Sequence, residues 1–168
     1  LNVSTGQWEA LPPLSTRRSH AALCVLDGRL FVVGGRIAVE EYVAVEHRWV
    51  PVPDMPRAVQ DTRAVALDGK LLVIGGWGIY DASEPTCTVY EYDPGDGSWK
   101  KLPSLLPKQY YGAVTVLGGD IVVMGGRQAP GGGHLASVKR YNRRQQCWEA
   151  MPSLTDPLES SAAVVVQV

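Results

Sequence analysis

The strongest constraint on the fold is a set of landmarks that recurs along the whole chain. Glycine pairs stand at residues 34–35, 75–76 and 125–126, at intervals of about 40 to 50 residues, and each pair ends an apolar run. Tryptophans keep the same interval, at Trp8, Trp49, Trp99 and Trp148. A sequence repeat of this length predicts similar structural units, each of which buries its apolar faces against its neighbours.

Two further positions recur together with the tryptophan. A tyrosine stands seven residues before it in three of the units, and Leu1 takes that place in the first unit. An apolar residue and a proline follow at the third and fourth positions after it, as in Leu102 and Pro103. Because these positions recur as a set, we interpret them as one structural repeat rather than as coincidence.

Each complete unit predicts four short strands. In the first, residues 20–26 and 29–33 are separated by Asp27 and Gly28, a pair suited to a two-residue hairpin in which both central residues need positive φ. The second strand is apolar on both faces and is expected to lie between neighbouring sheets. The tyrosine and tryptophan fall on the third and fourth strands, where a hairpin can bring their rings together. Sheets of this kind are stable when they stack radially around an axis.

With these residues established, the chain resembles the kelch repeat. The resemblance rests on the glycine pair, the tyrosine–tryptophan spacing and the Leu-Pro ending, and it covers essentially the whole chain. It implies an all-β, kelch-type β-propeller fragment made of radially arranged four-stranded antiparallel blades. The expected units are a partial blade with the third and fourth strands at 1–14, complete repeats at 15–55, 56–105 and 106–154, and a partial blade with one strand at 155–168.

The resemblance also bears on the size of the whole protein. Kelch propellers usually close with more blades than the landmarks mark out here, so the chain is expected to be a piece of a larger protein that contains the remaining blades. The alternative is a four-bladed ring closed by pairing of its two ends. If the chain is a fragment, its exposed strand edges are expected to pair with the remaining blades or with another copy of the chain.

Composition narrows the classes of function. A formal net charge of −1 and a pI near 6.3 provide no global positive field, so no nucleic acid is expected as a partner. The longest apolar runs, such as 162–166, are far too short to span a membrane. Three cysteines without a Cys-x-x-Cys spacing predict neither a disulfide framework nor a zinc site. These features favour a cytoplasmic or nucleocytoplasmic protein.

Two classes of loop are expected to open on the same face of a propeller and to form its binding site. The d–a loops join the last strand of one unit to the first strand of the next, at 12–19, 53–60, 103–110 and 152–160. The b–c loops join the second and third strands of a unit, at 36–38, 77–87 and 127–137. The predicted partner-binding residues are arginines, a lysine and aromatic residues of these loops: Arg17, Arg18, Arg36, Arg57, Trp77, Tyr80, Lys108, Tyr110, Tyr111 and Arg127.

This mixture of arginine and rigid rings is typical of binding hot spots, and it predicts an acidic or phosphorylated peptide as the ligand. The alternative is that acidic residues of the same loops pair with the arginines and only hold the loops in place. Trp77 falls off the tryptophan interval, so it either provides a stacking surface or covers the loop beneath it. The resemblance implies a protein-binding scaffold, such as the substrate-recognition module of a ubiquitin-ligase adaptor.

The sequence supports an enzymatic function less well than a protein-binding one. His20, His47 and His134 fall at different heights of the expected propeller, so no copper site like that of the kelch-type oxidases is predicted, and no other metal, cofactor or catalytic residue is expected. The alternative is a carbohydrate-active propeller similar to the sialic acid mutarotases. Such a protein needs a glutamate opposite an arginine, and the candidates are Glu40, Glu84 and Glu159.

Overall fold

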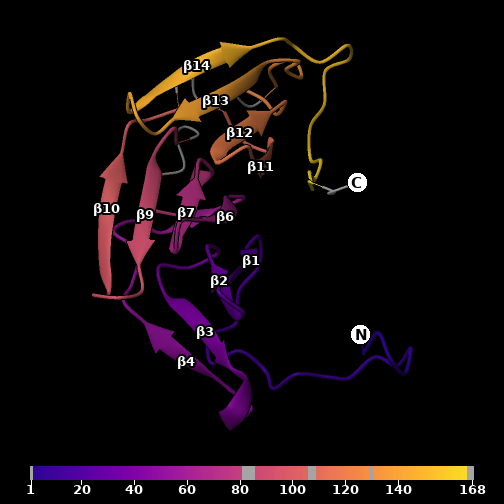
Figure 1. The fold of residues 1–168 in the computed structure, drawn as a ribbon, viewed down its shortest axis with the longest axis vertical. Helices are drawn as coiled ribbons and strands as arrows, with labels where there is room; N and C mark the ends of the chain where they lie inside the picture. The colour runs from indigo at the N-terminus through magenta and orange to yellow at the C-terminus, as the bar shows by residue number, and fades with distance from the viewer. Residues whose placement is uncertain (1, 81–85, 106–108, 129–130, 166–168) are drawn as a thin grey trace.

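The computed structural model describes residues 2–80, 86–105, 109–128 and 131–165, and these form three four-stranded antiparallel sheets that fan out around one axis (Figure 1). Blade 1 contains β1 (Ala22–Leu26), β2 (Arg29–Val33), β3 (Val39–Val43) and β4 (Arg48–Val52). Blade 2 contains β6 (Arg63–Leu67), β7 (Lys70–Ile74), β9 (Val89–Asp93) and β10 (Ser98–Leu102). Blade 3 contains β11 (Ala113–Leu117), β12 (Asp120–Met124), β13 (Val138–Asn142) and β14 (Cys147–Met151). The predicted radial, four-stranded β-propeller architecture is confirmed.

The innermost strands are β1, β6 and β11, and β4, β10 and β14 lie at the periphery (Figure 1). The hairpins that start each blade turn as the sequence predicts, since Asp27 and Gly28 have φ values of 50° and 75°. The equivalent pairs in blades 2 and 3 also have positive φ. One short 3-10 turn, η1 (Ala44–Glu46), joins β3 to β4. No helix in the described ranges is long and apolar enough to cross a membrane.

The apolar cores lie between blades, which explains why the second strand of a unit is apolar on both faces. Leu71 and Val73 of β7 belong to the core shared with blade 1, together with Phe31. Leu72 and Ile74 of the same strand belong to the core shared with blade 3. Successive side chains of β7 point to opposite faces of the sheet, so this one strand contributes apolar side chains to both interfaces of the central blade.

The tyrosine–tryptophan pairs lie directly opposite each other on neighbouring strands, as predicted. The ring centroids are 5.3, 4.9 and 5.2 Å apart in the three blades. Each indole N–H also donates to a proline carbonyl in the preceding unit: Trp49 to Pro12, Trp99 to Pro53 and Trp148 to Pro103, at 2.9, 2.9 and 3.0 Å. The recurring proline thus accepts a hydrogen bond from the next blade along the chain, a role that its sequence position did not reveal.

The glycine pairs permit close approach of the backbone between loops, as expected. Gly76 has a φ of 104°, and a Cβ atom placed on it would lie 2.6 Å from the carbonyl oxygen of Gln60. Only a residue without a side chain fits such a position. The pair in blade 2 therefore brings its b–c loop against the d–a loop that precedes the blade.

Three features differ from the expected strand pattern. β5 (Val59–Gln60) and β8 (Trp77–Gly78) form an additional two-stranded sheet between the loops of blade 2. Residues 2–14 contain one isolated bridge, from Asn2 to Gln7, and the described residues 155–165 contain one bridge at Leu158, where strands were expected. Among the described residues, neither segment forms a ladder with a blade, and single backbone hydrogen bonds, such as that from Gly126 to the Leu158 carbonyl, join the second to the loops of blade 3.

The first strand of blade 1 also begins later than expected, at Ala22 rather than at His20. His20 has a φ of 56°, and the equivalent residues Asp61 and Tyr111 have φ values of 54° and 56°. This left-handed conformation lies outside the β region, so the strand cannot extend through it. The side chains of these three residues contact one another, as described below.

Candidate functional site

The d–a and b–c loops meet at one face of the described blades. In blade 3, Tyr110 and Arg127 exchange two backbone hydrogen bonds of 3.0 and 2.9 Å. In blade 2, the equivalent contact is the pairing of β5 with β8. Because each contact ties one loop class to the other, the predicted loop residues are brought together in space in two adjoining pockets.

The first, which we name the aromatic pocket, has a volume of about 410 Å³. Its walls come from both loop classes of blades 2 and 3: Gln60, Asp61, Trp77, Tyr110, Tyr111, Arg127 and Gly131. The ring of Trp77 meets that of Tyr110 edge to face at 5.5 Å, and the Tyr110 ring lies 4.8 Å from that of Tyr111. Tyr110 is buried, whereas Trp77 and Tyr111 are partly exposed. The buried ring thus supports the two exposed ones.

Three side chains form a hydrogen-bonded row, of which Asp61 and Tyr111 line the aromatic pocket. The Asp61 carboxylate lies 2.7 Å from Nδ1 of His20 and accepts a hydrogen bond of 3.1 Å from the Tyr111 hydroxyl. Burial raises the pKa of Tyr111, and the neighbouring Asp61 charge raises it further. The phenol is therefore a neutral donor that fixes the orientation of the carboxylate.

Arg127, at the rim of the aromatic pocket, is part of a charged cluster. Its guanidinium forms an ion pair with Glu159, and His134 Nε2 lies 3.2 Å from the same carboxylate. His134 Nε2 is also 2.8 Å from the Arg127 guanidinium. The charge of Arg127 is therefore matched within the protein.

The second pocket, which we name the arginine pocket, has a volume of about 390 Å³ and is lined by Arg17, Arg18, Ser19, Gly35, Arg36 and Ile79. Arg17 and Arg36 are exposed, and Arg36 Nε donates to the Arg17 carbonyl at 3.3 Å. Among the residues that the structure describes, no carboxylate forms an ion pair with either arginine. Two guanidinium groups thus face solvent together.

Arg18, predicted to contact a partner, is instead used inside blade 1, where its side chain is only 1% exposed. It donates to the Ala38 carbonyl at 2.7 Å and to Glu40 at 2.6 Å, and Ser15 donates to the other Glu40 oxygen. Burial alone would raise the pKa of Glu40, but the hydrogen bonds from Ser15 and Arg18 bring it below its usual value. This buried pair ties the loops of blade 1 to β3.

Of the other predicted residues, Tyr80 and Arg57 line neither of the two pockets. Tyr80 is exposed beyond the end of β8, and Arg57 is partly buried in the d–a loop before blade 2. Lys108 falls outside the described residues, as does Glu84. Within the described part of the chain, no group of three His, Cys, Asp or Glu side chains is arranged to hold a metal ion.

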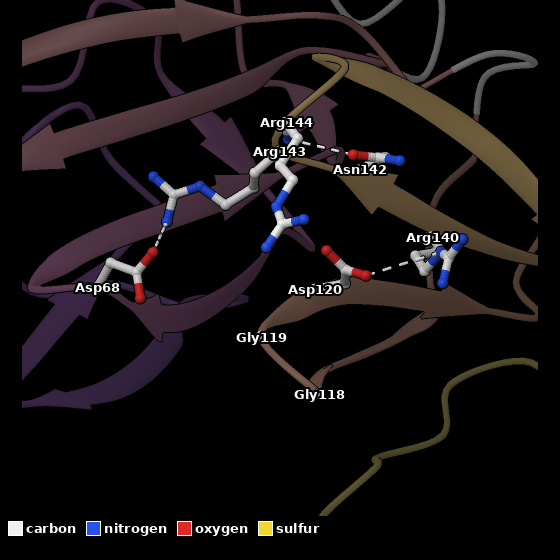
Figure 2. Close-up of a pocket in the computed structure, with 8 residues that line it drawn as sticks. All are labelled: Asp68, Gly118, Gly119, Asp120, Arg140, Asn142, Arg143 and Arg144. Atoms are coloured by element: carbon white, nitrogen blue, oxygen red, sulfur yellow. Dashed lines mark hydrogen bonds and ion pairs between the residues drawn. The ribbon is translucent and has the colours of Figure 1, made fainter.

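A third pocket, of about 480 Å³, was not predicted and lies on the opposite face, among the turns of blades 2 and 3 (Figure 2). It is lined by Asp68, Gly118, Gly119, Asp120, Arg140, Asn142, Arg143 and Arg144. Arg143 pairs with Asp68 at 2.6 Å and with Glu91 at 3.5 Å, so it bridges the two blades. Arg140 pairs with Glu149 at 2.6 Å and with Asp120 at 3.7 Å. The adjacent arginines in a polar turn were the sequence signal for this charge network.

The radial four-stranded blades, joined through tryptophan–proline hydrogen bonds, define the architecture of a β-propeller. The chain belongs to the kelch family: family models described as "Kelch motif" match residues 17–56, 61–106 and 110–155. The three matched segments coincide with the three blades.

Curated relatives agree with this assignment, and a solved structure shares the fold. The chain is 28% identical to the Kelch-like protein terF of Aspergillus terreus, over 90% of the chain and 39% of that protein. It is 28% identical to alpha-scruin of Limulus polyphemus and 26% identical to the Kelch repeat and BTB domain-containing protein 2 of Ectromelia virus, over 16% and 32% of those proteins. The structure of YjhT superposes with a TM-score of 0.78 at 14% identity, over 86% of this chain and 53% of that one. The chain thus spans well under half the length of these curated relatives.

Proposed function

We propose that this chain is a protein-binding scaffold that recognises a peptide segment of its partner with the face formed by the d–a and b–c loops. The observation that carries the proposal is the pair of adjoining pockets on that face, because they combine exposed arginines with rigid aromatic rings. The kelch-like relatives support a scaffold role. One relative is named for a BTB domain beside its kelch repeats, which supports a substrate-recognition role in a cytoplasmic or nuclear ubiquitin-ligase adaptor.

The arginine pocket is the part of this face that suits an acidic or phosphorylated segment. Arg17 and Arg36 are exposed, and neither is matched by a carboxylate among the described residues. Guanidinium groups bind carboxylates and phosphates through two parallel hydrogen bonds, and such charge-assisted bonds are stronger than neutral ones. A ligand that supplies an anion here would pair with guanidinium groups that no carboxylate of the described residues reaches.

Selection of a phage-displayed random peptide library on the purified chain tests this proposal. Peptides selected on the wild type should be enriched in Asp and Glu, and the Arg17→Glu, Arg36→Glu double variant should lose that enrichment. Arg144→Glu, an exposed change on the opposite face, is the matched control and should keep it. Failure to enrich acidic peptides, or the same enrichment on the double variant, would contradict the proposal.

A second candidate function is favoured by the cluster of Arg127, Glu159 and His134. A mutarotase-like propeller needs a glutamate opposite an arginine, and Glu159 fulfils this on the loop face. Glu40 does not, because it is buried against Arg18. Exchange between the anomers of N-acetylneuraminate, followed by NMR, should be accelerated by the wild type and not by Glu159→Gln. Equal exchange rates with and without the wild-type protein would exclude this candidate.

A further inference from the structure

We propose that the aromatic pocket binds a cationic side chain, a lysine or arginine, of the partner segment. The inference rests on the proposed function and extends it. The arginine pocket is proposed to bind an acidic residue of the partner segment, and the aromatic pocket adds a basic residue of the same segment. It stands on the charges, the rings and the position of this pocket.

The aromatic pocket contains one carboxylate, Asp61, that no lysine or arginine pairs with among the described residues. Asp61 is 12% exposed, and its partners are the His20 imidazole and the neutral Tyr111 hydroxyl. Arg127 is paired with Glu159, and Arg63, which lies near Tyr111, donates to the Thr62 carbonyl at 3.2 Å. Asp61 is therefore available to pair with a cation of the partner.

The carboxylate also has room for a further donor. A carboxylate offers about four acceptor positions, and the two hydrogen bonds to Asp61 leave part of that capacity unused. Burial of an incompletely paired carboxylate is unfavourable, so a cation that reaches it gains more than the same pair would gain in water.

The rings of the aromatic pocket suit a positive charge as well. Trp77 and Tyr111 are partly exposed, and both contact the buried ring of Tyr110, which holds them in place. Electron-rich ring faces attract lysine and arginine head groups, and tryptophan does so best. The alkyl stem of such a side chain also covers apolar ring surface. A volume of about 410 Å³ lies within the range of small ligand sites and accommodates one long side chain.

The aromatic and arginine pockets are close enough for one peptide to occupy both. Trp77 lines the aromatic pocket and Ile79, two residues further along the same segment, lines the arginine pocket. Two residues of extended chain span roughly 6 to 7 Å. An extended partner segment with an acidic and a basic side chain a few residues apart therefore matches both pockets at once.

The test uses two small probes that differ in charge, N-acetyl-lysine methylamide and its neutral counterpart N-acetyl-norleucine methylamide. Binding is followed through the indole N–H resonance of Trp77 in the NMR spectrum, which Trp77→Phe assigns. The lysine probe should bind at least about fivefold more tightly than the norleucine probe, the ratio expected of one cation–π contact and one partly exposed charge pair.

Two variants test whether the proposed residues cause the preference for the lysine probe over the norleucine probe. Asp61→Asn should weaken lysine binding about threefold and leave norleucine binding unchanged, since it removes the charge pair and keeps the cation–π contact. Asparagine tolerates the left-handed backbone of this position, so the variant should keep the wild-type unfolding temperature. Glu159→Gln, which leaves Arg127 unpaired at the rim, should also weaken lysine binding. Asp68→Asn, a 71% exposed carboxylate on the opposite face, is the control and should change neither affinity.

Three results would overturn the inference: no shift of the Trp77 resonance with the lysine probe, equal affinities for the two probes, or equal losses in Asp61→Asn and Asp68→Asn. These results would leave the proposed function standing, because peptide selection on the arginine pocket has a separate readout. Loss of acidic enrichment together with intact lysine binding would instead remove the acidic-ligand proposal and keep this pocket.

Discussion

Replacement of Trp99 by alanine is expected to lower the free energy of unfolding by about 3 kcal/mol, at the low end of the range for a large aromatic residue because the ring is partly exposed. About 1 kcal/mol of this comes from the hydrogen bond to the Pro53 carbonyl. A further contribution of about 0.5 to 1.5 kcal/mol comes from the ring pair with Tyr92. The remainder is burial against the core shared by blades 1 and 2.

Two variants separate these contributions. Trp99→Phe keeps an aromatic ring but removes the N–H donor, so it should cost about 1 kcal/mol. Trp8→Ala is the matched control, since Trp8 occupies the same position of the repeat but is 83% exposed, and it should change stability by less than about 0.5 kcal/mol.

Urea denaturation of the whole chain, followed by far-ultraviolet circular dichroism, measures all three variants. The reasoning would be refuted if Trp8→Ala destabilised the chain as much as Trp99→Ala. It would equally be refuted if Trp99→Phe were as stable as the wild type, because the hydrogen bond from Trp99 to the Pro53 carbonyl would then contribute nothing to stability.

Three other perturbations test separate parts of the structure. Folding lowers the pKa of Glu40, so its ionised form should stabilise the chain above about pH 4.5, and this stabilisation should be lost as the pH falls through the lower folded pKa. In denaturation curves measured from pH 3 to 7, Glu40→Gln should therefore reduce the fall in the free energy of unfolding at low pH. Gly76→Ala should cost more than about 2 kcal/mol, from its positive φ and the contact with the Gln60 carbonyl, whereas Gly133→Ala, with open space around it, should stay near wild type in the same assay. Burial raises the pKa of the Cys24 thiol to about 11, so a disulfide reagent at pH 8 should label this thiol only after unfolding. Cys24→Ala identifies the labelling due to Cys24, and rapid labelling of that thiol in the native chain would show that blade 1 opens.

The features that the sequence predicted well depend on short-range geometry. Asp27 and Gly28 specify their turn because few residue pairs accept two positive φ values in succession. Tyr92 and Trp99 specify the pairing of β9 with β10 because their spacing places them opposite each other. In both cases, the residues that determine the structure lie within a few positions of one another.

The features that the sequence did not reveal join residues from different units. Asp61 contacts His20 of the preceding unit and Tyr111 of the following one, and nothing in the spacing of these residues indicates that their side chains meet. Arg18 was assigned to the partner-binding surface because it lies in a d–a loop and arginine is typical of binding hot spots. One signal for its burial was available: Glu40 stands two residues before Tyr42 and shares its face of β3, so an interior carboxylate needed a cation.

The tryptophan–proline hydrogen bond has a consequence for how chains of this kind vary in length. The tryptophan donor and the proline acceptor of a unit stand four residues apart, yet Trp49, Trp99 and Trp148 each donate to a proline carbonyl of the preceding unit. Gain or loss of one whole unit by duplication or deletion therefore regenerates the same joint at the new boundary. A deletion that removed only part of a unit would instead leave an indole or a carbonyl with no counterpart.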